Sequence, residues 1–100
     1  MEIFNLKDMK AMPYEQRDKN VFYEAPQFKT RIIQLSPGGR MPKCDMETFV
    51  IFIVVEGSAK IKVNQKEMFL IANECLITEP AVLSMTTESG VKIMGVQIKQ

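Results

Sequence analysis

PGGRMPKCDMETFVIFIVVEG, residues 37–57, contains the most informative pattern in the chain, because its second half, Phe49–Val55, is apolar at every position. Side chains of a strand alternate between two faces, so an uninterrupted apolar run predicts a strand that is covered on both faces. In a small barrel one face is the core. The N-terminal arm is one candidate cover for the other face, and a second subunit is the favoured one, because little chain remains to do the covering.

Strand patterns recur along the rest of the chain. Ser58–Asn64, SAKIKVN, alternates apolar and polar residues with a period of two, which is typical of a strand with one wet face. Turn signals such as Ser36–Gly39, Glu56–Gly57 and Ser89–Gly90 separate the candidates. The remaining predicted strands are Val21–Ala25, Lys29–Leu35, Thr48–Val55, Glu67–Ile71, Glu74–Thr78, Val82–Thr87 and Val91–Lys99. Many short strands at this spacing predict an all-β sandwich or barrel.

Composition limits the classes of function. One hundred residues, 46% of them hydrophobic, suit a single small domain, for which pairing with another copy would add buried surface. A net charge of +1 argues against binding to nucleic acid or to an anionic membrane, because both need a clustered basic surface. The polar N-terminus and the short apolar runs lead us to expect a cytoplasmic protein in which Cys44 and Cys75 are free thiols.

The segment from Arg31 to Ile98 resembles the cupin superfamily. The first motif of that family reads G-x5-H-x-H-x3,4-E-x6-G, and Gly38 and Gly57 fit its two glycines without a gap. Cys44 and Met46 then stand at the two histidines, and Val50 stands at the glutamate. The resemblance implies a small double-stranded β-helix, or jelly-roll barrel, as a single cupin domain over residues 1–100, with an N-terminal arm at 1–27 and the barrel at 28–99.

The second cupin motif, G-x5-P-x-G-x2-H-x3-N, keeps none of its named residues. Its positions hold Asn73, Glu79, Ala81, Ser84 and Glu88. The metal centre of the family uses three imidazoles and a carboxylate, which suit borderline divalent ions. This chain contains no histidine, and a thiol, a thioether, an isopropyl group and a hydroxyl replace those ligands. We therefore expect no metal and no cofactor.

The resemblance also implies which side chains line the barrel. They are Cys44, Met46, Val50, Phe52, Val54 and Ser84, with Met94 as an addition. Such a lining either fills the barrel, giving a structural or regulatory module, or leaves a pocket for a small apolar ligand. The small side chains of Val50 and Ser84 favour the pocket slightly. We expect a metal-free protein, a homodimer, that binds a small molecule or has a regulatory or structural role.

Two alternatives stay open. Cys44 and Met46 offer the thiolate and thioether that Cu(I) accepts, although sulfur in a small barrel is more often simple core filling. A metal-independent isomerase or lyase would need an acid and a base at the barrel mouth, with Cys44 as a nucleophile that has no imidazole partner. Candidates for that role are Tyr23, Arg31, Arg40, Asp45 and Glu47, of which the last two have the outward parity on a regular strand. No catalytic residue is assigned, and the segment around Tyr14 is interpreted as a solvated connection.

Overall fold

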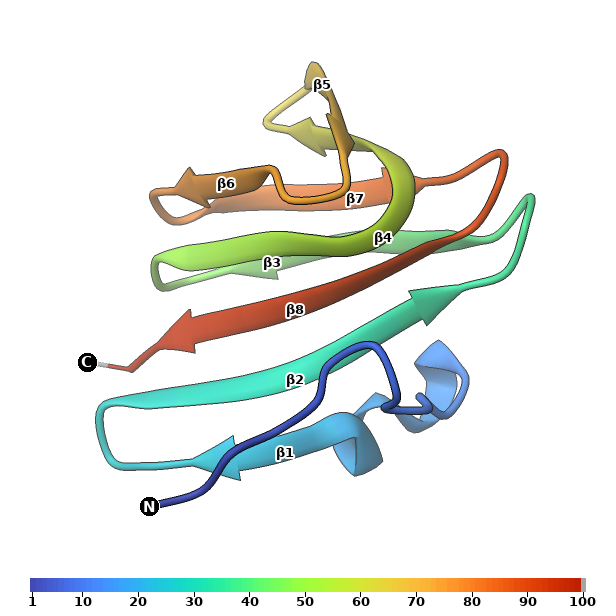
Figure 1. The fold of residues 1–100 in the computed structure, drawn as a ribbon. Coiled ribbons are helices and arrows are strands. Elements are labelled where there is room, and N and C mark those ends of the chain that lie inside the picture. The colour runs from blue at the N-terminus through green and yellow to red at the C-terminus, as the bar shows by residue number, and fades with distance from the viewer. Residues whose placement is uncertain (100) are drawn as a thin grey trace.

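The computed structural model describes residues 1–99 and consists of antiparallel strands preceded by a short 3-10 helix (Figure 1). The elements are η1 (Tyr14–Asn20), β1 (Val21–Glu24), β2 (Phe28–Leu35), β3 (Arg40–Met46), β4 (Val50–Val63), β5 (Lys66–Ile71), β6 (Cys75–Thr78), β7 (Ala81–Thr86) and β8 (Val91–Ile98). Hydrogen bonds connect the strands in the order β1-β2-β8-β4-β7-β3, and β5 and β6 also pair with β4. The prediction of an all-β architecture is confirmed.

Strand β4 connects the two faces of the barrel. Its first half pairs with β6 and β8, and its second half pairs with β5 and β7. The sequence predicted two strands with a turn at Glu56–Gly57, and this is wrong, because β4 runs through that point as one strand of 14 residues. Gly57 has a φ of +82°, and the ladder to β8 is irregular between Val54 and Glu56. A glycine beside a bulge redirects the chain without ending the strand.

Strand β3 was not predicted. It lies at the edge of the sheet, where it pairs only with β7, and its register shifts between Met41 and Cys44. Pro42 stands in this shifted segment. A proline has no N–H to donate, so it is tolerated at an edge or a bulge, and it interrupts the alternation by which a strand is identified in sequence.

The core lies between the inward rows of the two sheets. The side chains of Ile61 and Ile93 are 0% exposed, and those of Val54, Leu83 and Met85 are 1% exposed. Of the residues that alternate with these rows and point outward, Ile51 and Ile53 are half-buried, whereas Lys92 is buried where the N-terminal segment meets β8. None of the helices in residues 1–99 has the length and apolar character that a membrane crossing requires.

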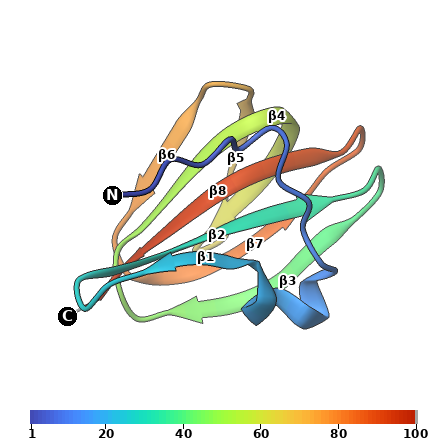
Figure 2. The ribbon, with the colours of Figure 1, turned by 60° about the horizontal axis from the view of Figure 1, so that its bottom comes forward.

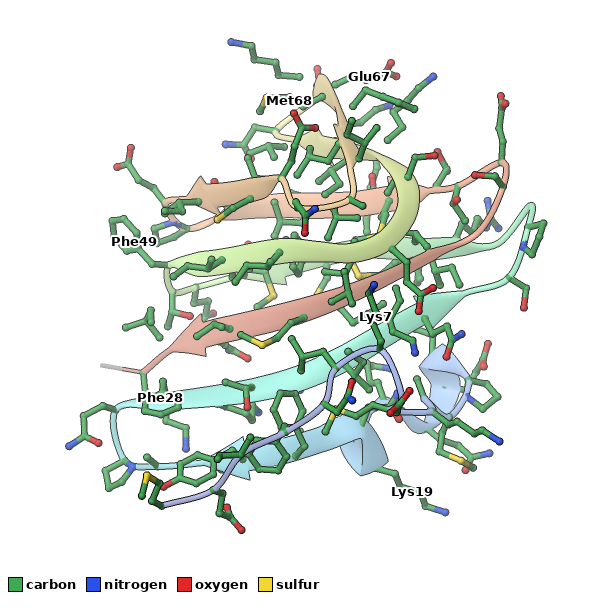
Figure 3. All side chains as sticks on the ribbon, in the orientation of Figure 1. Lys7, Lys19, Phe28, Phe49, Glu67 and Met68 are labelled. Carbon is green, nitrogen blue, oxygen red and sulfur yellow. The ribbon has the colours of Figure 1, made fainter. Side chains whose placement is uncertain are left out.

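The N-terminal segment crosses the outer side of β1 and β2 and reaches β8 (Figures 1 and 3). There the ammonium of Lys92 donates a hydrogen bond to the carbonyl oxygen of Lys7 at 2.5 Å and lies 3.5 Å from the carboxylate of Glu56. The side-chain amide of Asn20 holds the backbone of Met12 through two hydrogen bonds, of 2.7 and 3.0 Å. These contacts place η1 at one end of the barrel.

Candidate functional site

A cavity of about 270 Å³ opens at the end of the barrel where η1 approaches β3. Figure 2 shows η1 between the ends of β1 and β3, and side chains from η1, β2, β3, β4, β7 and β8 border the cavity. A larger hollow, of about 670 Å³, lies between the N-terminal segment and the turns at 36–39 and 89–90. Of the residues predicted to line the barrel, none borders that larger hollow.

The floor of the smaller cavity is apolar. Cys44, Met46, Val50 and Phe52, all of them predicted interior residues, border it. Gly95 of β8 also borders the cavity, and a Cβ added there would lie 3.3 Å from the ring of Phe52. Glycine at this position therefore gives the Phe52 ring its place in the wall.

The two sulfur atoms of the floor contact each other. The thiol of Cys44 donates a hydrogen bond to the thioether sulfur of Met46 across 3.4 Å. Asp45 was expected to point away from the barrel; it is exposed, but it still borders the cavity. The outward parity itself holds, because Cys44, Asp45 and Met46 pair in regular register with β7 and Asp45 lies opposite the exposed Val82.

The other predicted interior residues do not border the cavity. Val54 is buried in the core beyond it. Ser84 and Met94 have the outward parity, because their chain neighbours Leu83 and Ile93 occupy the inward positions of β7 and β8. Ser84 borders a separate surface hollow with Lys43 and Lys62, which corrects its predicted place in the barrel.

The residues at the cupin metal positions do not fit a metal centre. Cys44 and Met46 offer soft sulfur, Val50 offers no donor atom, and Ser84 lies on the other side of its strand. Residues 1–99 contain no group of three or more His, Cys, Asp or Glu side chains that would hold a metal ion. A borderline divalent ion would therefore lack the nitrogen and oxygen donors it prefers.

Polar and charged side chains form the mouth of the cavity. They are Tyr14, Arg17 and Asp18 of η1, Lys29 and Arg31 of β2, Asp45 of β3 and Gln97 of β8. The interpretation of the Tyr14 segment as a solvated connection is wrong, because the Tyr14 ring packs against the core. Only the folding of η1 across the barrel end shows this. No spacing in the sequence indicates it.

Tyr14 reports the electrostatics of the mouth. Burial raises the pKa of its hydroxyl above the ordinary value of 10.0, while the positive charges of Arg17 and Arg31 act to lower that pKa and Cys44 acts to raise it. The Arg17 guanidinium lies 4.5 Å from the centre of the Tyr14 ring and donates a hydrogen bond to the Tyr14 carbonyl oxygen at 3.3 Å. Tyr14 and Arg31, together with Cys44, are thus close enough for their charges to interact.

Only some of the residues considered for acid-base catalysis lie at one site. Tyr23 stacks on Phe28 with ring centres 5.8 Å apart, and Arg40 borders the larger hollow. Arg31 and Asp45 border the smaller cavity, whereas Glu47 does not. The described residues therefore place an apolar floor beneath a charged mouth, an arrangement suited to binding.

The fold is similar to solved structures at low sequence identity. A cupin superfamily protein from Desulfitobacterium hafniense DCB-2 superposes with a TM-score of 0.75 and 9% identity, covering 80% of this chain and 74% of that protein. The TT1209 protein of Thermus thermophilus superposes with a TM-score of 0.82 and 18% identity, covering 98% of this chain and 97% of that protein. KdgF from Halomonas sp. superposes with a TM-score of 0.72 and 11% identity, covering 80% of this chain and 76% of that protein. No protein-family model and no curated protein matches the chain.

Proposed function

We propose that this chain is a metal-free protein that binds a small organic molecule inside its barrel. The chain has the cupin jelly-roll fold, and its side chains at the metal positions do not suit a metal. The observation that carries the proposal is the cavity of about 270 Å³ above Cys44, Met46, Val50 and Phe52. Ligand sites are concave and mainly apolar, with a few polar groups that orient the ligand. Both parts are present here, the apolar floor and the polar mouth.

The size of the cavity limits the ligand. Its volume equals that of about nine water molecules in the liquid, at the lower end of the range for small-molecule sites. A single six-membered ring with a short substituent is of this size, and a dinucleotide is much too large. Catalysis is not favoured, because the Cys44 thiol has no imidazole to activate it and is hydrogen-bonded to Met46.

Phenylacetamide, a neutral probe of this size, tests the proposal. Binding is followed through the methyl resonance of Met46 in protein labelled at the methionine methyl groups, and through native mass spectrometry of the untagged protein. We expect a saturable shift of the Met46 resonance in the wild type. We expect no shift in Cys44→Phe, whose larger side chain fills the cavity, and retained binding in Cys44→Ser, the control of similar size. Absence of binding in the wild type, together with a native subunit mass equal to that of the chain alone, would contradict the proposal.

We also propose that the protein is a homodimer that pairs through the outward side of β4, β6 and β8. This outer apolar face consists of Phe49, Ile51, Ile53, Ile77, Met94, Val96 and Ile98. Ile51 lies opposite Ile77 on one side and Val96 on the other, so the apolar rows are continuous across the strands. Figure 3 shows Phe49 at the end of β4 away from Lys7, where the N-terminal segment meets β8.

The accessible surface of the chain supports this assembly. The subunit exposes 6537 Å², whereas a monomeric protein of 11.4 kDa is expected to expose about 5,800 Å². The difference of roughly 700 Å² is close to the area of about 800 Å² that each partner buries in a standard interface. A second copy of the chain, seated on the outer apolar face, would therefore bring the exposed surface into the normal range.

Sedimentation equilibrium with matched variants tests the dimer. Ile77→Lys introduces a charge on the outer apolar face at a side chain that is 65% exposed in the subunit, so the fold should persist while the dimer dissociates. Phe69→Lys is the control, because Phe69 is 66% exposed but lies on β5, opposite Lys60. A monomeric wild type, or equal dissociation in both variants, would refute the proposed interface.

A further inference from the structure

The inward row of β2 becomes cationic where it reaches the cavity mouth. Leu35 and Ile33 of this row are buried apolar residues, and Arg31 and Lys29 continue it. Arg31 faces Gly95 across the ladder between β2 and β8. Because glycine has no side chain, the β8 residue directly opposite Arg31 adds no side chain to the inner face. The fold therefore directs two long cationic side chains towards an apolar cavity.

Within residues 1–99, neither Lys29 nor Arg31 forms an ion pair within 4.0 Å or a side-chain hydrogen bond, and Arg17 is engaged only with Tyr14. The carboxylate of Glu24, opposite Lys29 on β1, forms its ion pair with Lys99, and the charges of Lys29 and Arg31 also act on it. The acidic groups at the mouth are Asp18 and Asp45, so the positive charges outnumber the negative ones. A guanidinium presents a fixed fork of donors that matches a carboxylate.

We propose that the ligand of the cavity is a small organic carboxylate with an apolar body. The body contacts the floor of the cavity, and the carboxylate lies at the mouth, where Arg31 and Lys29 donate hydrogen bonds to its oxygens. This inference rests on the proposed binding function and adds the chemical class of the ligand to it. A small, partly closed cavity strengthens such charge-assisted hydrogen bonds relative to those in open water.

Phenylacetate and phenylacetamide separate the class of ligand from the existence of the site, because they share their shape and differ in charge. The affinities of both compounds are measured by titration calorimetry at 20 mM and 300 mM NaCl. At 20 mM NaCl, phenylacetate should bind about tenfold more tightly than phenylacetamide, as one additional charge-assisted hydrogen bond predicts. The preference should shrink at high salt, because the mouth is open to solvent. Equal or tighter binding of phenylacetamide would overturn the inference and leave the binding function standing. No binding of either compound would overturn both.

Variants of Arg31 identify the group responsible. Arg31→Gln should abolish most of the preference for phenylacetate over phenylacetamide, and circular dichroism checks that the variant is folded. Arg31→Lys, which keeps the charge, should restore much of the preference. Lys66→Gln is the control, because it removes an exposed positive charge at the turn between β4 and β5, outside the cavity. An unchanged preference in Arg31→Gln would overturn the assignment.

Discussion

The thiol of Cys44 donates a hydrogen bond to the thioether sulfur of Met46 across 3.4 Å. These residues stand at the positions of two histidines in the cupin motif, and both border the cavity. Sulfur is polarisable and makes favourable contacts with aromatic rings. The positions that hold metal ligands in the cupin motif thus form, in this chain, part of an apolar wall.

The two cysteines should differ in their reaction with iodoacetamide. Cys75 is exposed on β6, whereas Cys44 is half-buried and hydrogen-bonded, so Cys75 should be modified faster at neutral pH. Peptide mass spectrometry, with Cys44→Ser and Cys75→Ser as references, measures both rates. Phenylacetate should protect Cys44 and leave Cys75 unaffected. Faster modification of Cys44 would instead indicate an activated thiol.

Tyr14 should ionise at a higher pH than an ordinary tyrosine. The chain has two tyrosines and no tryptophan, so in Tyr23→Phe the ultraviolet absorbance of phenolate follows Tyr14 alone. Burial raises the pKa of Tyr14 above 10.0, and the positive charge of Arg31 opposes this rise. The midpoint should therefore lie above 10.0 and rise further when Arg31→Gln is added. A midpoint at or below 10.0 would show that the Tyr14 ring does not pack against the core.

Gly57→Ala should destabilise the protein more than Gly38→Ala. Both glycines have a positive φ, of +82° and +80°, so both substitutions carry a similar backbone penalty. A Cβ on Gly57 would lie 2.1 Å from the carbonyl oxygen of Gly90, whereas a Cβ on Gly38 meets no atom within 4 Å. We expect losses in the free energy of unfolding of about 1 kcal/mol for Gly38→Ala and about 3 kcal/mol or more for Gly57→Ala. Urea denaturation measures both, and equal losses would disprove the close approach.

The ion pair between Glu24 and Lys99 should contribute to stability only above mildly acidic pH. The hydrogen bond from the Lys99 ammonium, and then its charge, lower the pKa of Glu24 below 4.5 in the folded state. The folded state then binds fewer protons than the unfolded state near pH 4, so stability falls as the pH drops through the folded pKa. Between pH 6 and pH 3, the urea concentration at the midpoint of unfolding should fall less in Glu24→Gln than in the wild type. Glu88→Gln, at a turn, should behave as the wild type does.

The sequence supported the fold prediction where local pattern and tertiary structure agree. The alternation in Ser58–Asn64 and the apolar run Phe49–Val55 both become parts of β4, because the side-chain period of a strand is a local property. The strand β3 and the bend at Gly57 were misread, since a bulge and a positive φ break that period without ending the hydrogen bonding.

The sequence reached the floor of the candidate site and only part of its mouth, namely Arg31 and Asp45. The resemblance to the cupin motif pointed to Cys44, Met46, Val50 and Phe52, which lie on two strands that follow each other in the chain. Ser84 was misplaced because the second motif keeps no anchor residue, and an error of one position reverses the face of a strand. Tyr14 and Lys29 carry no sequence signal of a site, since a tyrosine or lysine in a polar segment is usually exposed.

The sequence by itself determined the all-β class and, through its resemblance to the cupin motif, predicted the jelly-roll barrel and the replacement of the metal ligands, because residue type and spacing along one segment carry each of these. Only the tertiary structure decided that the barrel end is open, that η1 lies across it, and that Arg31 faces Gly95 beside an apolar floor. These features depend on contacts between residues far apart in the chain, whose geometry is set by the register of the strands and by the packing of the whole barrel.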